Sequence, residues 1–177
     1  MRQLNYFTYD VKRMLGKHKI RILYVWLSRS FWGILLYRIE RSLFLIFGKW
    51  YSYFRVPFVP LINLIQAYSN IDIHYKAVIK GGISILHPSV GIVISGQSSI
   101  GKNITLTGGN VIGVHKKCEP GTFVIGDGCT LGANATIIGP LKLGDKITVG
   151  AAACVVKDCL KKQTVLMGVP AKPKDEI

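Results

Sequence analysis

The feature that most constrains the fold is an aliphatic residue that recurs every six positions in the C-terminal part of the chain. The longest run has six consecutive matches, and a glycine directly follows four of them: Ile125, Leu131, Ile137, Leu143, Val149 and Val155, with Gly126, Gly132, Gly144 and Gly150. The same spacing occurs upstream in two shorter runs: Ile73, Ile79 and Ile85, then Ile94, Ile100, Leu106 and Ile112. A period of six fits neither an α-helix nor a simple alternating strand.

Each hexad is expected to form one short strand and a corner, so that three hexads, about eighteen residues, close one triangular coil. The aliphatic side chain then points inward and stacks on its counterpart one coil away. A glycine or another small residue beside it permits the tight corner. The sequence therefore predicts a mainly β protein built on a left-handed parallel β-helix.

Two breaks in the repeat indicate where chemistry is to be sought. Three extra residues are inserted before Ile94, close to His87, where a regular coil must bulge. The spacing from Ile112 to Ile125 is thirteen, two hexads plus one residue, and the segment GVHKKCEPGTF is expected to form an extruded loop. Rigid scaffolds tend to carry function in such interruptions, so His87 and this loop are the first candidates.

Residues 1–70 differ in composition from residues 71–177. They are rich in Leu, Ile, Phe, Tyr and Trp, and they hold 11 Lys and Arg against two acidic residues, Asp10 and Glu40, in a chain of net charge +14. No uncharged stretch reaches the ~20 residues that a membrane-spanning helix needs. We expect a short helical N-terminal region before the β-helix domain, with helices near residues 5–16, 19–47 and 59–68.

The positive charge of residues 1–70 lies on an apolar, aromatic segment. This combination fits an anionic membrane surface better than a nucleic-acid groove, so we expect no nucleic-acid partner. The apolar helix faces must be covered by each other, by another subunit or by lipid headgroups. The four cysteines show no paired metal spacing and no cleavable signal opens the chain, which predicts a cytoplasmic protein. If lipid headgroups cover residues 1–70, the protein is peripheral to the inner membrane.

Four motifs, in this order, resemble the hexapeptide acyltransferases: DIH at 72–74, LHPSVGIVIS around His87, LGANATIIGPLKLGDKITVGAAACVV from Leu131, and GVPAK at 168–172. Within that family the sequence is similar to serine acetyltransferases and to the sugar O-acetyltransferases of capsule and colanic acid biosynthesis. The resemblance covers about residues 72–173, with a looser match of the helical region to the colanic acid type. It implies an acyl-CoA-dependent O-acetyltransferase that uses acetyl-CoA and assembles as a homotrimer or a hexamer.

Transfer of an acetyl group from a thioester to a hydroxyl needs a base, and histidine suits that role near neutral pH. Asp72 precedes His87 by fifteen residues, nearly one coil, so both are expected near the same edge of adjacent coils about 4.8 Å apart. The resemblance implies that His87 is the catalytic base and that Asp72 orients its imidazole. A structural corner histidine is the alternative interpretation of His87.

The resemblance also implies a binding groove for acetyl-CoA. Gly113, Ala133 and Ala151 match positions that line the groove for the pantetheine arm, and the Gly113 N–H also matches a group that polarises the thioester carbonyl. Lys172 is expected to meet a CoA phosphate. Ordinary corner geometry is the alternative interpretation of the three small residues.

The acceptor prediction depends on Leu86 and His115. Leu86 precedes His87 where serine acetyltransferases carry an Asp, and no Arg follows Arg55. His115 lies near a substrate-binding histidine of the family, although strict register puts Thr122 there. Serine acetyltransferases hold the charged groups of serine with that Asp and with an Arg–His pair in the following loop. Because a site without these charged side chains should discriminate against serine, we expect a sugar hydroxyl of bacterial surface polysaccharide biosynthesis as the acceptor, either free, nucleotide-linked or lipid-linked.

Three alternatives stay open at this point. The first is serine O-acetyltransferase activity in cysteine biosynthesis. The second is a non-catalytic β-helix scaffold. The third is a zinc site of the carbonic anhydrase type built from His74, His87 and His115, but the usual His-x4-His pair is missing, so no metal is expected.

Overall fold

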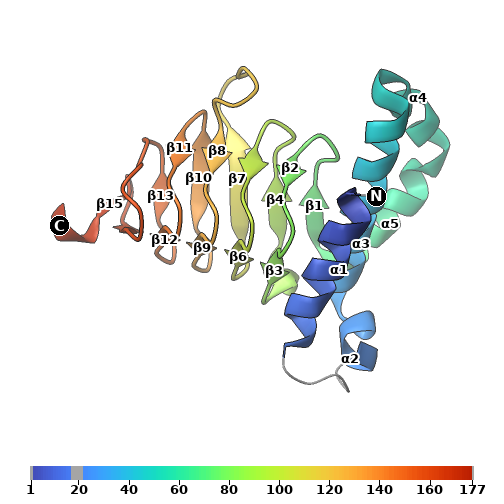
Figure 1. Ribbon diagram of the computed structural model, residues 1–177, viewed down its shortest axis with the longest axis horizontal. Helices are drawn as coiled ribbons and strands as arrows, with labels where there is room; N and C mark the ends of the chain where they lie inside the picture. Colours follow the sequence, from blue (N-terminus) through green and yellow to red (C-terminus); the bar gives the residue numbers. More distant parts are fainter. Residues whose placement is uncertain (1, 17–21, 177) are drawn as a thin grey trace.

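The computed structural model describes residues 2–16 and 22–176, and it places a helical region against one end of a parallel β-helix (Figure 1). The β-helix extends from these helices to the C-terminus at the opposite end of the molecule. The α-helices are α1 (Arg2–Leu15), α2 (Ile22–Leu27), α3 (Arg29–Phe47), α4 (Tyr51–Arg55) and α5 (Val59–Ser69). Short 3-10 turns are η2 (Gly48–Trp50), η3 (Val56–Phe58), η4 (Pro88–Val90) and η5 (Lys174–Glu176).

Short strands form three sheets, one on each side of the triangular coil. The first sheet has the order β1 (Ile71–Ile73), β4 (Ile92–Ile94), β7 (Asn110–Val114), β10 (Thr136–Gly139) and β13 (Cys154–Val155). The second has the order β2 (Val78–Ile79), β5 (Ser99–Ile100), β8 (Val124–Ile125) and β11 (Lys142–Leu143). The third has β3 (Ser84–Ile85), β6 (Thr105–Leu106), β9 (Thr130–Leu131), β12 (Thr148–Val149), β14 (Val165–Met167) and the antiparallel β15 (Lys172–Pro173).

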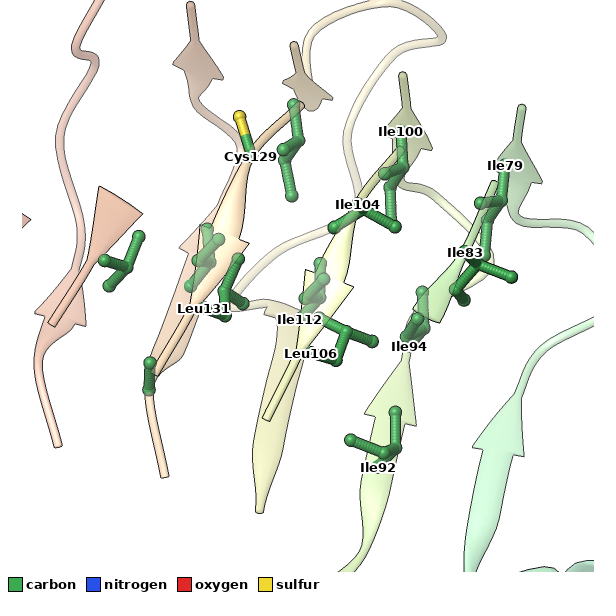
Figure 2. Packing of buried hydrophobic residues seen from close by; sticks show 14 of the residues in the cluster. Ile79, Ile83, Ile92, Ile94, Ile100, Ile104, Leu106, Ile112, Cys129 and Leu131 are labelled. Atoms are coloured by element: carbon green, nitrogen blue, oxygen red, sulfur yellow. The ribbon is translucent and has the colours of Figure 1, made fainter. Parts of the chain in front are cut away.

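The hexad aliphatics stack from coil to coil, as the repeat predicts. Parallel register pairs them in three rows, one on each sheet: Ile73, Ile94, Ile112, Ile137 and Val155; Ile79, Ile100, Ile125 and Leu143; Ile85, Leu106, Leu131, Val149 and Leu166. All are buried, and Figure 2 shows several of them pointing into the interior of the coils. Burial of each side chain contributes roughly 1.5–3 kcal/mol. The predicted left-handed β-helix is confirmed.

The glycines after the aliphatics permit the close approach of neighbouring coils. A Cβ atom at Gly126 would lie 2.4 Å from the carbonyl oxygen of Gly144, so no other residue fits there without a backbone shift. Both register breaks appear where the spacing indicates. The three extra residues form η4 and end at Gly91, whose φ of 89° is in the left-handed region. Residues 115–122 leave the coil between β7 and β8, and the chain returns to the core at Phe123.

The helices of residues 1–70 begin and end at other positions than the three expected helices. The helix expected at 19–47 is interrupted, because Ser28 is extended and its Oγ accepts a hydrogen bond from Phe31 N at 3.3 Å, which starts α3 there. The first three residues of that expected helix lie outside the described residues. α4 was not expected, and α5 ends at Asn70, whose left-handed φ of 57° stops the helix directly before β1.

A buried ion pair joins the helices to the first coil. Arg38 Nε of α3 donates to Asp10 Oδ2 of α1 at 2.9 Å, and both residues are buried. Asp10 Oδ1 accepts from the N–H groups of Gly82 and Ile83 at 2.6 and 2.9 Å, while Arg38 also donates to Ile79 O at 2.7 Å. These contacts satisfy backbone groups at the open end of the β-helix. None of the described helices is both long enough and apolar enough to cross a membrane.

Candidate active site

His87 lies on an exposed corner between the third and the first sheet. It follows β3 by two residues, and its N–H donates to Thr107 O of the next coil at 2.8 Å. The η4 bulge begins directly after it and keeps the local chain outside the regular coil. The backbone of His87 is therefore fixed by the β-helix, while its imidazole is accessible to solvent.

Asp72 lies one coil before His87, on the exposed face of β1. The two segments are neighbours, because Asn70 Nδ2 donates to Ser89 O at 2.9 Å. Asp72 Oδ1 accepts a hydrogen bond from Gln66 Nε2 at 3.0 Å, so α5 holds this carboxylate. Among the described residues no hydrogen bond links Asp72 to His87, and the predicted pair is adjacent but not joined in the single chain.

Ala133 and Ala151 lie along the same edge of the β-helix as His87. Both are exposed, and they occupy the corner between the third and the first sheet on successive coils. Backbone hydrogen bonds connect this corner from coil to coil: His87 N to Thr107 O, Asn134 N to Gly108 O and Ala152 N to Ala133 O, each at 2.8 Å. Small exposed residues therefore continue the edge away from the histidine, which leaves room for an extended ligand beside it.

Gly113 and His115 lie at the opposite end of the same sheet face. Gly113 pairs with Ile138 within the first sheet, and His115 opens the extruded loop. A strand rises about 3.3 Å per residue, so the length of β7 alone separates this end from the His87 corner by more than about 12 Å. Figure 1 shows the loop at the upper edge of the β-helix and the turn after β3 at the lower edge. One chain does not bring His115 and His87 together.

The remaining predicted residues are also exposed. Leu86 is 53% exposed directly beside His87. Lys172 lies in β15 at the far C-terminal end, where it pairs with Met167. Within the described residues no group of three His, Cys, Asp or Glu is placed to hold a metal ion.

His74 has a structural environment. Its ring stacks on Tyr75 with 4.5 Å between centroids, and its Nδ1 accepts a hydrogen bond from Lys76 N at 3.1 Å. Burial, reinforced by the positive charges of Lys76 and Arg55, lowers the pKa of His74 below its usual value. A neutral imidazole can accept this backbone hydrogen bond, so His74 stabilises the corner of the coil.

A cavity of about 710 Å³ opens beside His87, at the junction of the helices and the first coil. Residues 84–89 line one side, and α1, α2 and the start of α3 line the other. Two arginines, Arg13 and Arg29, belong to this lining. No sequence pattern indicated either arginine, because both lie more than fifty residues before His87 and only the packing of the helices brings them there.

The chain is similar to known proteins in sequence and in fold. A Mycobacterium tuberculosis serine acetyltransferase is 34% identical over 108 residues, 59% of this chain and 45% of that protein. A Helicobacter pylori serine acetyltransferase is 31% identical over 113 residues, 63% of this chain and 65% of that protein. The solved structure of a Neisseria gonorrhoeae serine acetyltransferase superposes with a TM-score of 0.79 at 28% identity, and the match covers 97% of this chain and 65% of that one.

The chain is similar to serine acetyltransferases in sequence and in fold. The structural match includes the helical region as well as the β-helix, since it covers 97% of the chain. The chain spans less than half of the length of the first curated relatives that it matches, for example 45% and 29%. No protein-family model matches it.

The predicted sugar acceptor of surface polysaccharide biosynthesis is wrong. The three relatives named above, from both comparisons, are serine acetyltransferases, which agrees with the alternative interpretation. The prediction relied on the absence of arginine from the β-helix and on Leu86 beside His87. That argument considered only residues 71–177, whereas the cavity beside His87 is half built by the helical region and contains two arginines.

Proposed function

We propose that the protein is an acetyl-CoA-dependent O-acetyltransferase whose acceptor is serine and whose general base is His87. The observation that carries this proposal is the similarity to serine acetyltransferases over 97% of the chain. One of the solved relatives, at 27% identity and a TM-score of 0.78, is a complex with serine. The exposed position of His87 beside a cavity supports the role assigned to it.

The chemistry required of His87 is a proton transfer. Acetyl-CoA supplies the activated acyl group when it is bound. His87 accepts the proton of the serine hydroxyl as that oxygen forms its bond to the acyl carbon, and it returns the proton to the sulfur as the C–S bond breaks. No proton or electron is gained or lost overall.

Asp72 is proposed to orient His87 and to stabilise its imidazolium form. The carboxylate is held by Gln66, and the neighbouring segments are joined through Asn70 and Ser89. A rotation of the exposed His87 side chain would let Nδ1–H donate to Asp72 once the acceptor is bound. Asp72 is therefore a positioning residue in this proposal, and it does not touch the reacting atoms.

The groove for acetyl-CoA is proposed to follow the corner that carries His87, Ala133 and Ala151. Both alanines are exposed, and their side chains are too short to cover the backbone of this edge. Pantetheine contains amide groups that need backbone partners, which such an edge offers. Lys172, exposed at the far end, is proposed to contact a phosphate of CoA.

A homotrimer is proposed as the working assembly, with two trimers forming a hexamer as its extension. Gly113 and His115 lie across a sheet face from His87, so they reach a common site only if they come from a neighbouring chain. In such a trimer His87 of one chain and the loop of the next chain line one cleft. His115 is then placed to contact the acceptor.

A subunit-mixing experiment tests this shared site. A Cβ atom at Gly113 would meet only Val111 Cγ1, at 3.8 Å, so Gly113→Leu should fold while it narrows the groove. His87→Ala and Gly113→Leu are each expected to be inactive alone. Mixed trimers should recover activity because some clefts combine His87 from one chain with Gly113 from another. If mixed trimers form but stay inactive, each site lies within one chain.

Peripheral contact with the cytoplasmic face of the inner membrane is proposed for residues 45–58. Trp50, Tyr53 and Phe54 are 69, 71 and 56% exposed there, and Lys49 lies beside them. The sequence has no acidic residue from position 41 to position 71, and Glu40 is buried against Arg55. Exposed aromatic rings next to cations fit an anionic lipid surface.

The activity is tested by thiol release from acetyl-CoA in the presence of serine. The wild-type protein is expected to release thiol in proportion to O-acetylserine formed, and His87→Ala is expected to abolish both. Absence of serine-dependent release from the purified assembly would contradict the proposed function.

A further inference from the structure

The cavity beside His87 is lined on one side by two arginines of the helical region, which we call its basic wall. Arg13 of α1 and Arg29 of α3 both line it, together with residues 84–89. Among the residues described as lining it, none is acidic. A ligand that enters this cavity therefore meets two guanidinium groups and the candidate base in one space.

Arg13 is fixed in place by the first two coils. Its guanidinium donates to the carbonyl oxygen of Gly82, to Ile104 O at 2.8 Å and to Thr105 Oγ1 at 2.7 Å. Burial lowers the pKa of this guanidinium, partly offset by nearby Tyr9 and Asp10. Its hydrogen bonds go to neutral oxygens, and within the described residues it forms no ion pair, so its charge contributes a positive potential to the cavity.

Arg29 is the cation that remains available to a ligand. Its side chain is exposed, and its guanidinium carbon lies 5.9 Å from the centre of the Tyr68 ring. The next residue, Ser30, is buried and donates from Oγ to Ile85 O at 2.9 Å. This bond fixes the start of α3 to β3, two residues before His87. Arg29 is in no ion pair that the described part of the chain contains.

We propose that Arg29 binds the carboxylate of the acceptor while the acceptor's hydroxyl lies at His87, and that Arg13 adds positive potential to the same cavity. This inference rests on the proposed function and names the residues that select the acceptor. A guanidinium pairs with a carboxylate through two parallel N–H···O bonds, which fixes the orientation of a small ligand. The helical region thereby takes part in acceptor recognition.

The experiment compares serine with serinamide, which keeps the hydroxyl and the amine but lacks the carboxylate. The wild-type assembly is expected to have a KM for serine roughly 10- to 100-fold below that for serinamide, the range of one charge-assisted pair. Arg29→Gln should raise the KM for serine to the level of serinamide. It should leave kcat, the KM for serinamide and the KM for acetyl-CoA close to wild type.

Two further variants make the test specific. Arg29→Lys keeps the charge but not the paired donors, so it should restore part of the preference for serine. Arg2→Gln removes an exposed arginine of α1 that lies outside the cavity, and it should behave as wild type. An unchanged KM for serine in Arg29→Gln, or an equal loss for both acceptors, would overturn the assignment.

A calorimetric titration separates this inference from the proposed function. Wild type and Arg29→Gln are titrated with serine and with serinamide in the absence of acetyl-CoA. Preference of the wild type for serine that disappears in Arg29→Gln supports the anion site even if no acetyl transfer occurs. Equal binding of the two ligands by the wild type rejects the anion site even if the enzyme acetylates serine.

Discussion

The helical region and the β-helix contain similar apolar residues but bury them to different degrees. In the β-helix the hexad aliphatics are almost entirely buried, for example Ile112 and Leu131 at 0% exposure. In the helical region Ile46, Trp50 and Tyr53 are 72, 69 and 71% exposed. A closed coil encloses its own core, whereas a few helices on one end of it cover only one of their faces. The β-helix thus buries its own hexad aliphatics, and α3 adds Ile34 and Tyr37 to the same core. The outer faces of the helices leave large apolar side chains exposed.

The largest expected effect is a loss of turnover, without a loss of stability, when the proposed catalytic residues of the β-helix are replaced. His87→Ala should lower turnover by about 10²–10⁴-fold, because base catalysis is lost. Asp72→Asn should cost the same or less, since the base remains and only its orientation weakens. Both side chains are exposed, so the unfolding midpoint of each variant should match wild type. Steady-state kinetics and thermal unfolding measure this, and near-normal rates for His87→Ala would refute its role.

The second effect concerns the junction between the two regions. Asp10→Ala should reduce the free energy of unfolding by about 3–5 kcal/mol, because it leaves the buried Arg38 charge and two N–H groups without their partner. The matched control is the exposed Lys161–Asp175 pair, at 3.4 Å, where Asp175→Ala should cost about 0–1 kcal/mol. Chemical denaturation of both variants provides the comparison. If Asp10→Ala lowers the free energy of unfolding as little as Asp175→Ala does, the buried ion pair does not stabilise the fold.

The third effect compares apolar truncations in the two regions. Ile112→Ala should cost about 2–5 kcal/mol, since it opens a cavity inside the β-helix. Leu64→Ala, at a position that is 66% exposed on α5, should change the free energy of unfolding by less than about 0.5 kcal/mol. A large loss for Leu64→Ala in the assembled protein would mean that another subunit covers this surface.

The smallest effect tests what covers the exposed helical surface. The protein should float with anionic vesicles at low salt and detach at high salt, because each Lys or Arg near the surface contributes about 1 kcal/mol. Lys49→Gln should weaken this binding about fivefold, and Lys161→Gln, on the β-helix, should not. If the protein stays unbound at both salt concentrations, its aromatic surface is covered by protein and the membrane proposal fails.

The sequence could predict the β-helix because its signal is local and repeated. Every coil places the same kind of residue at the same position, so the spacing of Ile125, Leu131 and Ile137 specifies both the strand and the stack. The register breaks likewise placed the bulge at His87 and the loop at His115. The interruption of the long helix at Ser28 was missed because a single capping residue carries a weak signal among so many apolar residues. The existence of α4 was missed because no side chain caps its start.

The cavity beside His87, which we propose as the acceptor site, is formed by tertiary structure alone. Its basic wall combines Arg13 and Arg29 with residues 84–89, and no pattern in the sequence relates positions so far apart. The ion pair between Asp10 and Arg38, which fixes the helices on the first coil, is equally non-local. A repeat of six determines a coil because each hexad meets only its neighbours. The placement of the helices depends on long-range contacts, both polar ones and the apolar packing of α3 on the first coil, and these form only when the chain is folded.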